Sequence, residues 1–64
     1  MILNGQTFHL AEPATIMELL IEAGFEAGRV AVMRNGEIVP RTELAECVVT
    51  EDDNLEVVSF VGGG

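Results

Sequence analysis

Two Asn-Gly pairs, Asn4-Gly5 and Asn35-Gly36, constrain the fold of this chain more than any other feature. Both lie between short apolar segments, which span residues 1–3 and 7–10 around the first pair and residues 30–33 and 37–39 around the second. An Asn-Gly pair in this setting is the strongest short-range signal of a β-hairpin, because its two-residue turn needs a positive φ at both positions. We therefore expect two hairpins, the second ending at Pro40, which stops a strand or confines it to a sheet edge.

A single main helix is expected over about residues 15–23, between the two hairpins. Thr15 and Glu18 have the three-residue spacing of a capping box, in which each side chain binds the other residue's backbone N–H. Gly24 stands where a left-handed cap would end the helix, and Phe25 is placed to fold back onto the last turn. The face expected to be buried repeats with helical spacing and consists of Ile16, Leu19, Leu20 and Ala23.

The second half of the chain predicts a short helical turn and one further strand. Residues 41–47 are expected to form the turn, with Thr42 as its cap, Leu44 facing inward and Cys47 packed as a small apolar group. Residues 51–54 predict a solvated acidic turn, since they lack the alternating oxygen ligands and central glycine of a calcium loop. The apolar residues 55–61 then form the last strand, which runs into three glycines.

The order of these elements predicts an α+β domain of the β-grasp class. One main helix lies across a mixed sheet of four to five strands. We expect the final strand to pair centrally beside the first, because both are strongly apolar. The prediction divides the chain into a β-grasp domain over residues 1–61 and a flexible C-terminal glycine tail over residues 62–64.

Charge and cysteine content restrict the partners and the compartment. The 64 residues carry a formal net charge of −8 at pH 7, with three arginines and no lysine. We expect no binding to nucleic acid or membrane; a basic protein partner fits better, although the charge also keeps a small apolar domain soluble. The single Cys47 excludes an internal disulfide and indicates a reducing compartment. With no membrane-length apolar segment and no basic n-region, the sequence predicts a cytoplasmic protein.

The sequence holds no convincing catalytic constellation, so we expect a substrate of other enzymes rather than an enzyme. His9 and Cys47 are the only residues of their kinds, and nothing in the sequence brings them together. No glycine-rich phosphate loop, metal site or bound cofactor is predicted. What remains is the terminal carboxylate of Gly64, which a glycine tail can carry into a narrow pocket because glycine has no Cβ. A frayed terminus is the plainer alternative.

Alternation along the last strand points to a partner-binding surface. Leu55 and Val57 share one face, and Glu56, Val58 and Phe60 share the other. If Leu55 and Val57 meet the helix, Val58 and Phe60 are exposed apolar residues beside the tail. Exposed apolar clusters often mark partner surfaces, so these two residues are the candidates for docking.

Four segments match a known family when they are taken together. They are the opening Ile-Leu-Asn-Gly, residues 15–20 of the helix, Val-Ala-Val-Met-Arg-Asn-Gly-Glu-Ile-Val-Pro-Arg at residues 30–41, and residues 55–64 with the glycine end. At this length they resemble the ThiS family, the ubiquitin-like sulfur carrier proteins of thiamine (thiazole) biosynthesis. The family often has Asp-Gly-Asp before the last strand and an aromatic residue near Leu44, so this chain departs from it at a turn and at a packing position.

The resemblance implies a sulfur-transfer cycle in which the chain is a protein cosubstrate. An E1-like, ThiF-type adenylyltransferase would use ATP to adenylate the carboxylate of Gly64, and a sulfur donor such as a cysteine desulfurase would convert the adenylate into a thiocarboxylate. A ThiG-type thiazole synthase would then receive the sulfur. Gly63 and Gly64 would carry the chemistry, while Gly62 and Val61 would guide the tail.

Three other functions stay open at this point. A small subunit of molybdopterin synthase has the same fold and a similar tail, although such chains are usually longer and often carry a proline before Gly-Gly. A non-covalent β-grasp interaction module would leave the glycines without a role. A protein modifier that forms isopeptide bonds would use the same activated carboxylate and leave conjugates on target lysines.

Overall fold

Both Asn-Gly pairs form the two-residue hairpin turns that the sequence predicts. The computed structural model describes residues 1–10 and 12–60, and in it all four turn residues have a positive φ, between 51° and 86°. The first turn joins β1 (Ile2–Leu3) to β2 (Gln6–Thr7), and the second joins β4 (Val30–Arg34) to β5 (Glu37–Val39). Each pair is antiparallel, so both predicted hairpins are confirmed.

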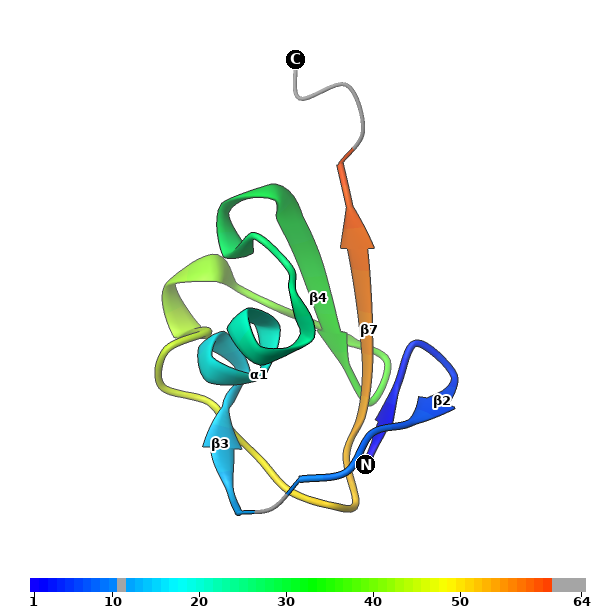
Figure 1. Cartoon of the computed structure of the whole chain (residues 1–64). Helices are drawn as coiled ribbons and strands as arrows, with labels where there is room; N and C mark the ends of the chain where they lie inside the picture. The colour runs from blue at the N-terminus through cyan, green and yellow to red at the C-terminus, as the bar shows by residue number, and fades with distance from the viewer. Residues whose placement is uncertain (11, 61–64) are drawn as a thin grey trace.

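The last strand, β7 (Asn54–Ser59), lies in the centre of the main sheet (Figure 1). The strand order is β2-β1-β7-β4-β5, with β7 parallel to β1 and antiparallel to β4. The predicted central pairing beside the first strand is therefore confirmed, as is a mixed sheet. The remaining elements are β3 (Ala14–Thr15), α1 (Ile16–Ala23), the 3-10 turns η1 (Ala27–Arg29) and η2 (Arg41–Glu43), and β6 (Val48–Val49).

The helix α1 begins and ends through the local signals read from its sequence. The Thr15 side-chain oxygen accepts a hydrogen bond from the Glu18 N–H at 3.2 Å, and the Thr15 N–H donates to the Glu18 carboxylate at 2.9 Å. At the other end Gly24 takes a φ of 90°, and the Phe25 N–H donates to the Leu20 carbonyl at 2.8 Å. The capping box and the glycine cap are both confirmed, and they fix where the helix meets the sheet.

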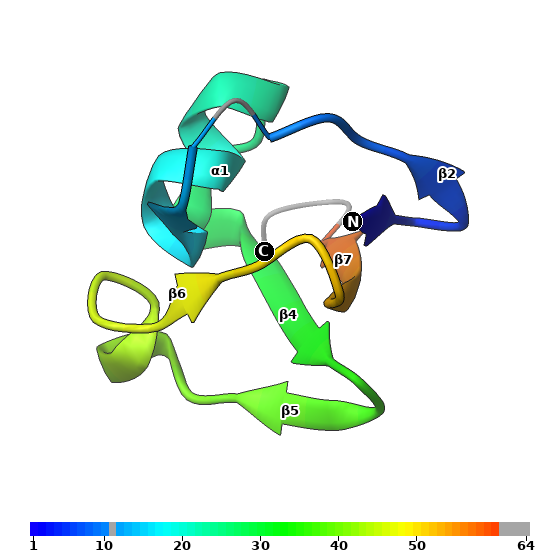
Figure 2. The same ribbon diagram turned by 90° about the horizontal axis from the view of Figure 1, so that it is seen from below.

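One face of the sheet is covered and the other is open. Figure 2 shows α1 and the β6 segment on the same side of the sheet. The core between these layers consists of Met1, Leu3, Leu10, Ile16, Leu19, Leu20, Val30, Val32, Leu44, Val49, Leu55 and Val57. None of the helices in the described residues is long and apolar enough to cross a membrane.

A second, two-stranded sheet between β3 and β6 was not predicted. The segments contain two residues each, too few for a period of two to be recognised, and their pairing brings together residues 35 and 33 positions apart, Ala14 with Val49 and Thr15 with Val48. Val49 is fully buried. This small sheet closes the end of the core beneath the helix.

Two details of the second half depart from the sequence prediction. The η2 turn follows Pro40 with no side-chain cap, so the assignment of Thr42 as a cap is wrong because Thr42 lies inside the turn. Leu44 is buried and Cys47 packs partly buried against the core, as expected. The acidic turn is only partly solvated, since Asp53 is buried while its neighbours Glu51 and Asp52 are exposed.

Candidate functional site

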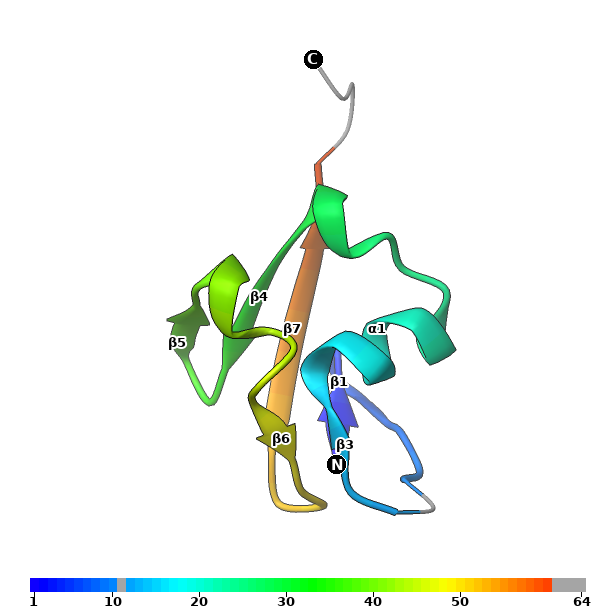
Figure 3. The same cartoon turned by 90° about the vertical axis from the view of Figure 1, so that its left-hand side faces the viewer.

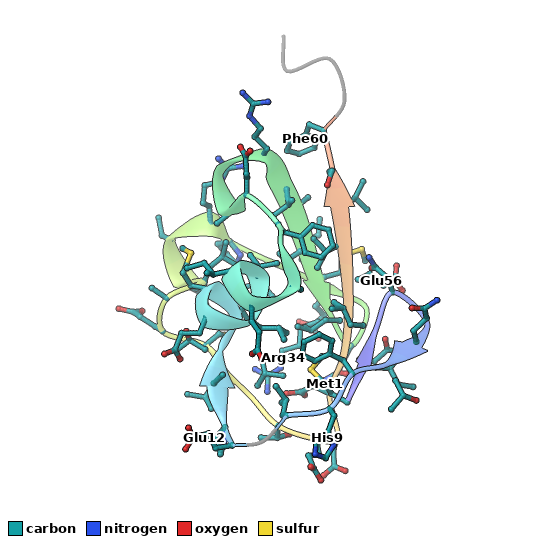
Figure 4. The ribbon with its side chains drawn as sticks, in the orientation of Figure 1. Met1, His9, Glu12, Arg34, Glu56 and Phe60 are labelled. Atoms are coloured by element: carbon teal, nitrogen blue, oxygen red, sulfur yellow. The ribbon has the colours of Figure 1, made fainter. Side chains whose placement is uncertain are left out.

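The central strand β7 separates a core face from an exposed face, as its alternation predicts. Leu55 is 0% exposed and Val57 6%, and both belong to the core beneath α1. Val58 is 56% exposed, and Glu56 is exposed as well. Figure 4 shows the Glu56 side chain on the side of the ribbon away from the helix. The placement of Val58 on an uncovered surface follows directly from the period of the strand.

Neighbouring strands extend this uncovered surface, which we call the open face. The register pairs Val58 with Ala31 across β4, and it pairs Met33 with both Glu56 and Ile38, so these side chains share one side of the sheet. Ile2 joins them from β1, because its neighbour Leu3 points into the core. The open face thus consists of Ile2, Ala31, Met33, Ile38, Glu56 and Val58. It is a mainly apolar surface with the Glu56 carboxylate on its central strand, and the exposed Thr7 and Asn54, which both pair with Ile2, lie on the same side of the sheet.

Phe60 lies one residue beyond β7, at a corner of the molecule (Figure 4). Its backbone N–H donates to the Arg29 carbonyl at 2.8 Å, which holds the end of the strand against η1. Figure 3 shows this turn beside the end of β7 that lies opposite the N-terminus. The ring is 55% exposed and lines two shallow recesses that also contain the core residue Val30. Phe60 is therefore exposed as expected, but it lies at the rim of the sheet rather than in a row with Val58.

The remaining site residues of the sequence prediction cannot be placed. Val61, Gly62, Gly63 and Gly64 lie outside the described residues. We call the region of Phe60 and the two recesses that it lines the Phe60 corner. Residues 61–64 follow Phe60 directly in the sequence.

Two asparagines bind β7 from opposite sides, Asn35 at its start and Asn4 near its middle, and sequence reasoning missed both contacts. The Asn4 side chain accepts from the Val57 N–H at 2.7 Å and donates to the Val57 carbonyl at 3.2 Å. The Asn35 side chain accepts from the Asn54 N–H at 2.9 Å and donates to the Asp53 carboxylate at 3.1 Å. Each turn asparagine therefore continues the strand pairing with its side chain. The Asn-Gly signal located these residues but not these bonds.

Asp53 is a buried residue at the centre of a polar cluster where β7 begins; the partners in this cluster are partly or fully exposed. Its carboxylate accepts from the Thr50 N–H at 2.8 Å and from Asn35, and it forms an ion pair with Arg34 at 3.1 Å. Burial alone would raise the pKa of this carboxyl, but the hydrogen bonds from Thr50, Arg34 and Asn35, with the Arg34 charge, hold the pKa below its ordinary value. The same hydrogen bond and charge raise the pKa of Arg34. Both groups stay ionised, and the cluster joins the second hairpin to the last loop.

The side chains with catalytic or ligand chemistry do not form a centre of their own. His9 is exposed, and the Cys47 sulfur contacts the Arg34 guanidinium at 3.9 Å. Within residues 1–10 and 12–60, no three or more His, Cys, Asp or Glu side chains are grouped so as to hold a metal ion. What the described residues present instead are the open face and the exposed Phe60.

Comparisons with known proteins agree with the geometry. The model of the ThiS family matches residues 1–64. The chain is 41% identical over 64 residues to a thiazole synthase of Paramagnetospirillum magneticum and 48% identical over 63 residues to one of Magnetococcus marinus. It covers 100% and 97% of itself in these matches but only 20% and 19% of the two relatives, so it spans about a fifth of their length.

A solved structure has the same fold along nearly the whole chain. It is the crystal structure of a thiamine biosynthesis protein (ThiS) from Geobacter metallireducens, with a TM-score of 0.76 and 33% sequence identity. The match covers 98% of this chain and 96% of that one. The mixed sheet with one helix is therefore the β-grasp fold of that protein.

Proposed function

This chain belongs to the ThiS family, and we propose that it is a sulfur carrier that delivers sulfur to thiazole synthase in thiamine biosynthesis from a thiocarboxylate on Gly64. In this proposal residues 1–61 are the folded carrier and residues 62–64 are the reactive tail. The observation that carries the proposal is the course of β7. The central strand is bound by asparagine side chains on both sides and ends at Ser59 next to Phe60, and three glycines begin two residues after Phe60 in the sequence.

The chemistry needs activation, because an ionised carboxylate is a poor electrophile. In the first step a Gly64 carboxylate oxygen attacks the α-phosphorus of ATP on an E1-like, ThiF-type enzyme, and pyrophosphate leaves. The terminal sulfur of a persulfide on a donor such as a cysteine desulfurase then attacks the acyl carbon, and AMP leaves with the oxygen. A thiol reductant cleaves the S–S bond of the resulting acyl disulfide, forms a disulfide with the donor's cysteine and releases the thiocarboxylate. The product holds one C–S bond in place of one C–O bond. The chain supplies the carboxylate and the side-chain-free approach to it, since Gly63 and Gly64 add no Cβ in the partner's pocket.

We assign docking to the open face and the Phe60 corner. Val58 lies on the open face and Phe60 at the rim beside the tail, so a partner that takes up the tail meets both. An apolar surface of this kind gains by being covered, and the exposed Glu56 requires a cation or water opposite it. Val61 and Gly62 would then lead the tail from this surface into the partner.

The test is the intact mass of the chain after incubation with a ThiF-type enzyme, ATP and a sulfur source. Replacement of one oxygen by sulfur, mapped to Gly64, is the expected result. A chain ending at Gly62 should keep its fold by circular dichroism and gain no sulfur, because an exposed tail contributes little to the core. Sulfur loading of that truncated chain, or no loading of the full chain by an enzyme active on another carrier, would overturn the proposal.

Docking is tested with a matched pair of substitutions. Phe60→Glu places a charge in the proposed contact and should raise the dissociation constant of the activating enzyme at least about tenfold, as for a central apolar contact. Ile21→Glu makes the same change at an exposed isoleucine on α1, away from both surfaces, and should leave the constant unchanged. Equal effects of the two variants would assign the change to charge alone and move docking elsewhere.

A further inference from the structure

The three cations of this acidic chain are unevenly distributed. Arg34 is engaged by Asp53 at the start of β7. Arg29 and Arg41 both lie at the opposite end of the strand, where each lines one of the two recesses beside Phe60. Of the eleven acidic residues, only Glu26 lines either recess. The Phe60 corner is thus the basic region of a protein whose net charge is −8.

The geometry places the two arginines on either side of the Phe60 ring. One recess, of about 190 Å³, is lined by Arg41 together with Leu44 and Phe60. The other, of about 230 Å³, is lined by Arg29 together with Phe25 and Phe60. The first recess therefore combines apolar walls with one guanidinium, and the second adds Glu26 and Ser59 to its apolar residues and Arg29. A guanidinium beside apolar side chains is suited to a side chain that carries a carboxylate on an apolar stem.

Both guanidinium groups keep donors for an added ligand. Arg41 donates to the Gly28 carbonyl at 2.9 Å and the Val30 carbonyl at 3.5 Å, which uses two of its five N–H donors. Arg29 has one ion pair, with Glu26 at 3.4 Å, and the two side chains are 68% and 76% exposed. Such an exposed pair is worth little because both charges are solvated. An incoming carboxylate can therefore replace Glu26 at small cost.

We propose that Arg29, with Arg41 beside it, binds an acidic side chain of the enzyme that activates the tail. The proposal rests on the sulfur-carrier function. It requires a carboxylate on that enzyme at the mouth of the pocket that the tail enters. The positive charge of the Phe60 corner would meet this carboxylate, whereas the chain as a whole is negative. The carboxylate would orient the carrier, since charge complementarity fixes register and suppresses wrong partners.

The position of the corner favours a protein carboxylate over the phosphates of ATP. Four residues separate Phe60 from the end of Gly64, and extended chain spans about 3.3–3.6 Å per residue, or roughly 13–14 Å in total. A tail extended into the partner thus holds the reacting carboxylate too far from the corner for Arg29 to reach the nucleotide. The ligand at the corner must come from the rim of the pocket.

The decisive comparison is between Arg29→Gln and Gln6→Glu. Both change the net charge from −8 to −9, but Gln6 lies on β2 at the other end of the molecule. The dissociation constant of the activating enzyme is measured by calorimetry without ATP, at two salt concentrations. Arg29→Gln should weaken binding about three- to tenfold at low salt and less at high salt, while Gln6→Glu changes it less than twofold.

The two possible failures can be separated. ATP–pyrophosphate exchange with the wild-type chain tests the sulfur-carrier function, and its absence would remove the premise. If the wild-type chain supports exchange while Arg29→Gln binds as tightly as Gln6→Glu, only the carboxylate proposal is overturned. An effect of Arg29→Gln confined to the KM for ATP would likewise overturn it, because the arginine would then act on the nucleotide.

Discussion

The two ends of the central strand β7 are held in different ways. At its start, Asn35 binds Asn54 and the buried Asp53 joins Thr50, Arg34 and Asn35 in a polar cluster, and Asn4 binds Val57 from the opposite side further along the strand. Among the described residues, pairing with the β1 side ends at Val57, and the far end is held by β4 and by the bond from Phe60 to Arg29. The start of the strand is held by backbone pairing on both sides and by side chains, the far end by backbone bonds to one side.

The difference separates stability from function along a single strand. The Asp53 cluster contains charged groups that share one acceptor. Removing Asp53 therefore leaves several donors unpaired at once and lowers the free energy of unfolding. The Phe60 corner presents exposed side chains whose mutual contacts are worth little in water. Substitutions at the start of β7 should therefore destabilise the fold, and those at its end should alter recognition.

The largest expected effect on stability is that of Asp53→Ala. It leaves the Thr50 N–H, the Asn35 amide and the Arg34 guanidinium without their shared acceptor, and should cost about 2–4 kcal/mol of unfolding free energy. Urea denaturation measures the change. Asp52→Ala is the control, since Asp52 is exposed and its loss should stay within about 0.5 kcal/mol. Equal losses of unfolding free energy in the two variants would show that the contacts of Asp53 do not stabilise the fold.

A smaller loss is expected for Asn4→Ala. The substitution removes two hydrogen bonds to Val57 and places alanine at a φ of 52°, which asparagine tolerates better. We expect a loss of about 1–2 kcal/mol, measured by urea denaturation. Gln6→Ala, on the exposed side of the same hairpin, should change stability by less than about 0.5 kcal/mol. A loss no greater than that of the control would mean that β1 holds the strand without the side chain.

Acid should weaken the start of β7 through Asp53. Because the folded protein lowers the pKa of Asp53, its ionised form stabilises the fold fully above the unfolded value of about 3.9, and this contribution is lost as the pH falls through the lower folded pKa. Protonation keeps most of the contacts, so the loss should be smaller than that of Asp53→Ala. Urea denaturation below pH 4 should show a steeper decline for the wild type than for Asp53→Asn. Parallel declines would assign the acid sensitivity to other carboxyls.

The sequence predicted the fold well where a signal was local or periodic. Three features depend only on residues a few positions apart and could be predicted from the sequence alone: the Asn-Gly turns, the Thr15 cap and the alternation of β7. The β3–β6 pairing and the burial of Asp53 depend on groups far apart in the chain. Acidic residues in a run are usually solvated, so residues 51–54 predicted an exposed turn. Asp53 is buried because Arg34 and Asn35, which lie far from it in the sequence, bind its carboxylate.

The candidate site was predictable to a similar extent. Strand parity predicted that Val58 and Phe60 are exposed, which is confirmed, but it did not predict that Phe60 lies at the rim of the sheet, because β7 ends at Ser59. The arginines of the Phe60 corner gave no signal, since Arg29 and Arg41 come from separate turns. The number of charged residues can be counted from the sequence, but which of them lie close together depends on the fold.

The smallest stability effect should be that of Glu26→Gln, which tests the loosely held end of β7. Its ion pair with Arg29 is exposed, so its removal should change the unfolding free energy by no more than about 0.5 kcal/mol. The same change leaves Arg29 without its intramolecular partner and raises the positive charge of the Phe60 corner. Binding of the activating enzyme should therefore be as tight as in the wild type or tighter, the reverse of Arg29→Gln. Weaker binding would mean that Glu26 itself contacts the partner. The enzyme would then recognise the corner through the Glu26 carboxylate rather than through its arginines.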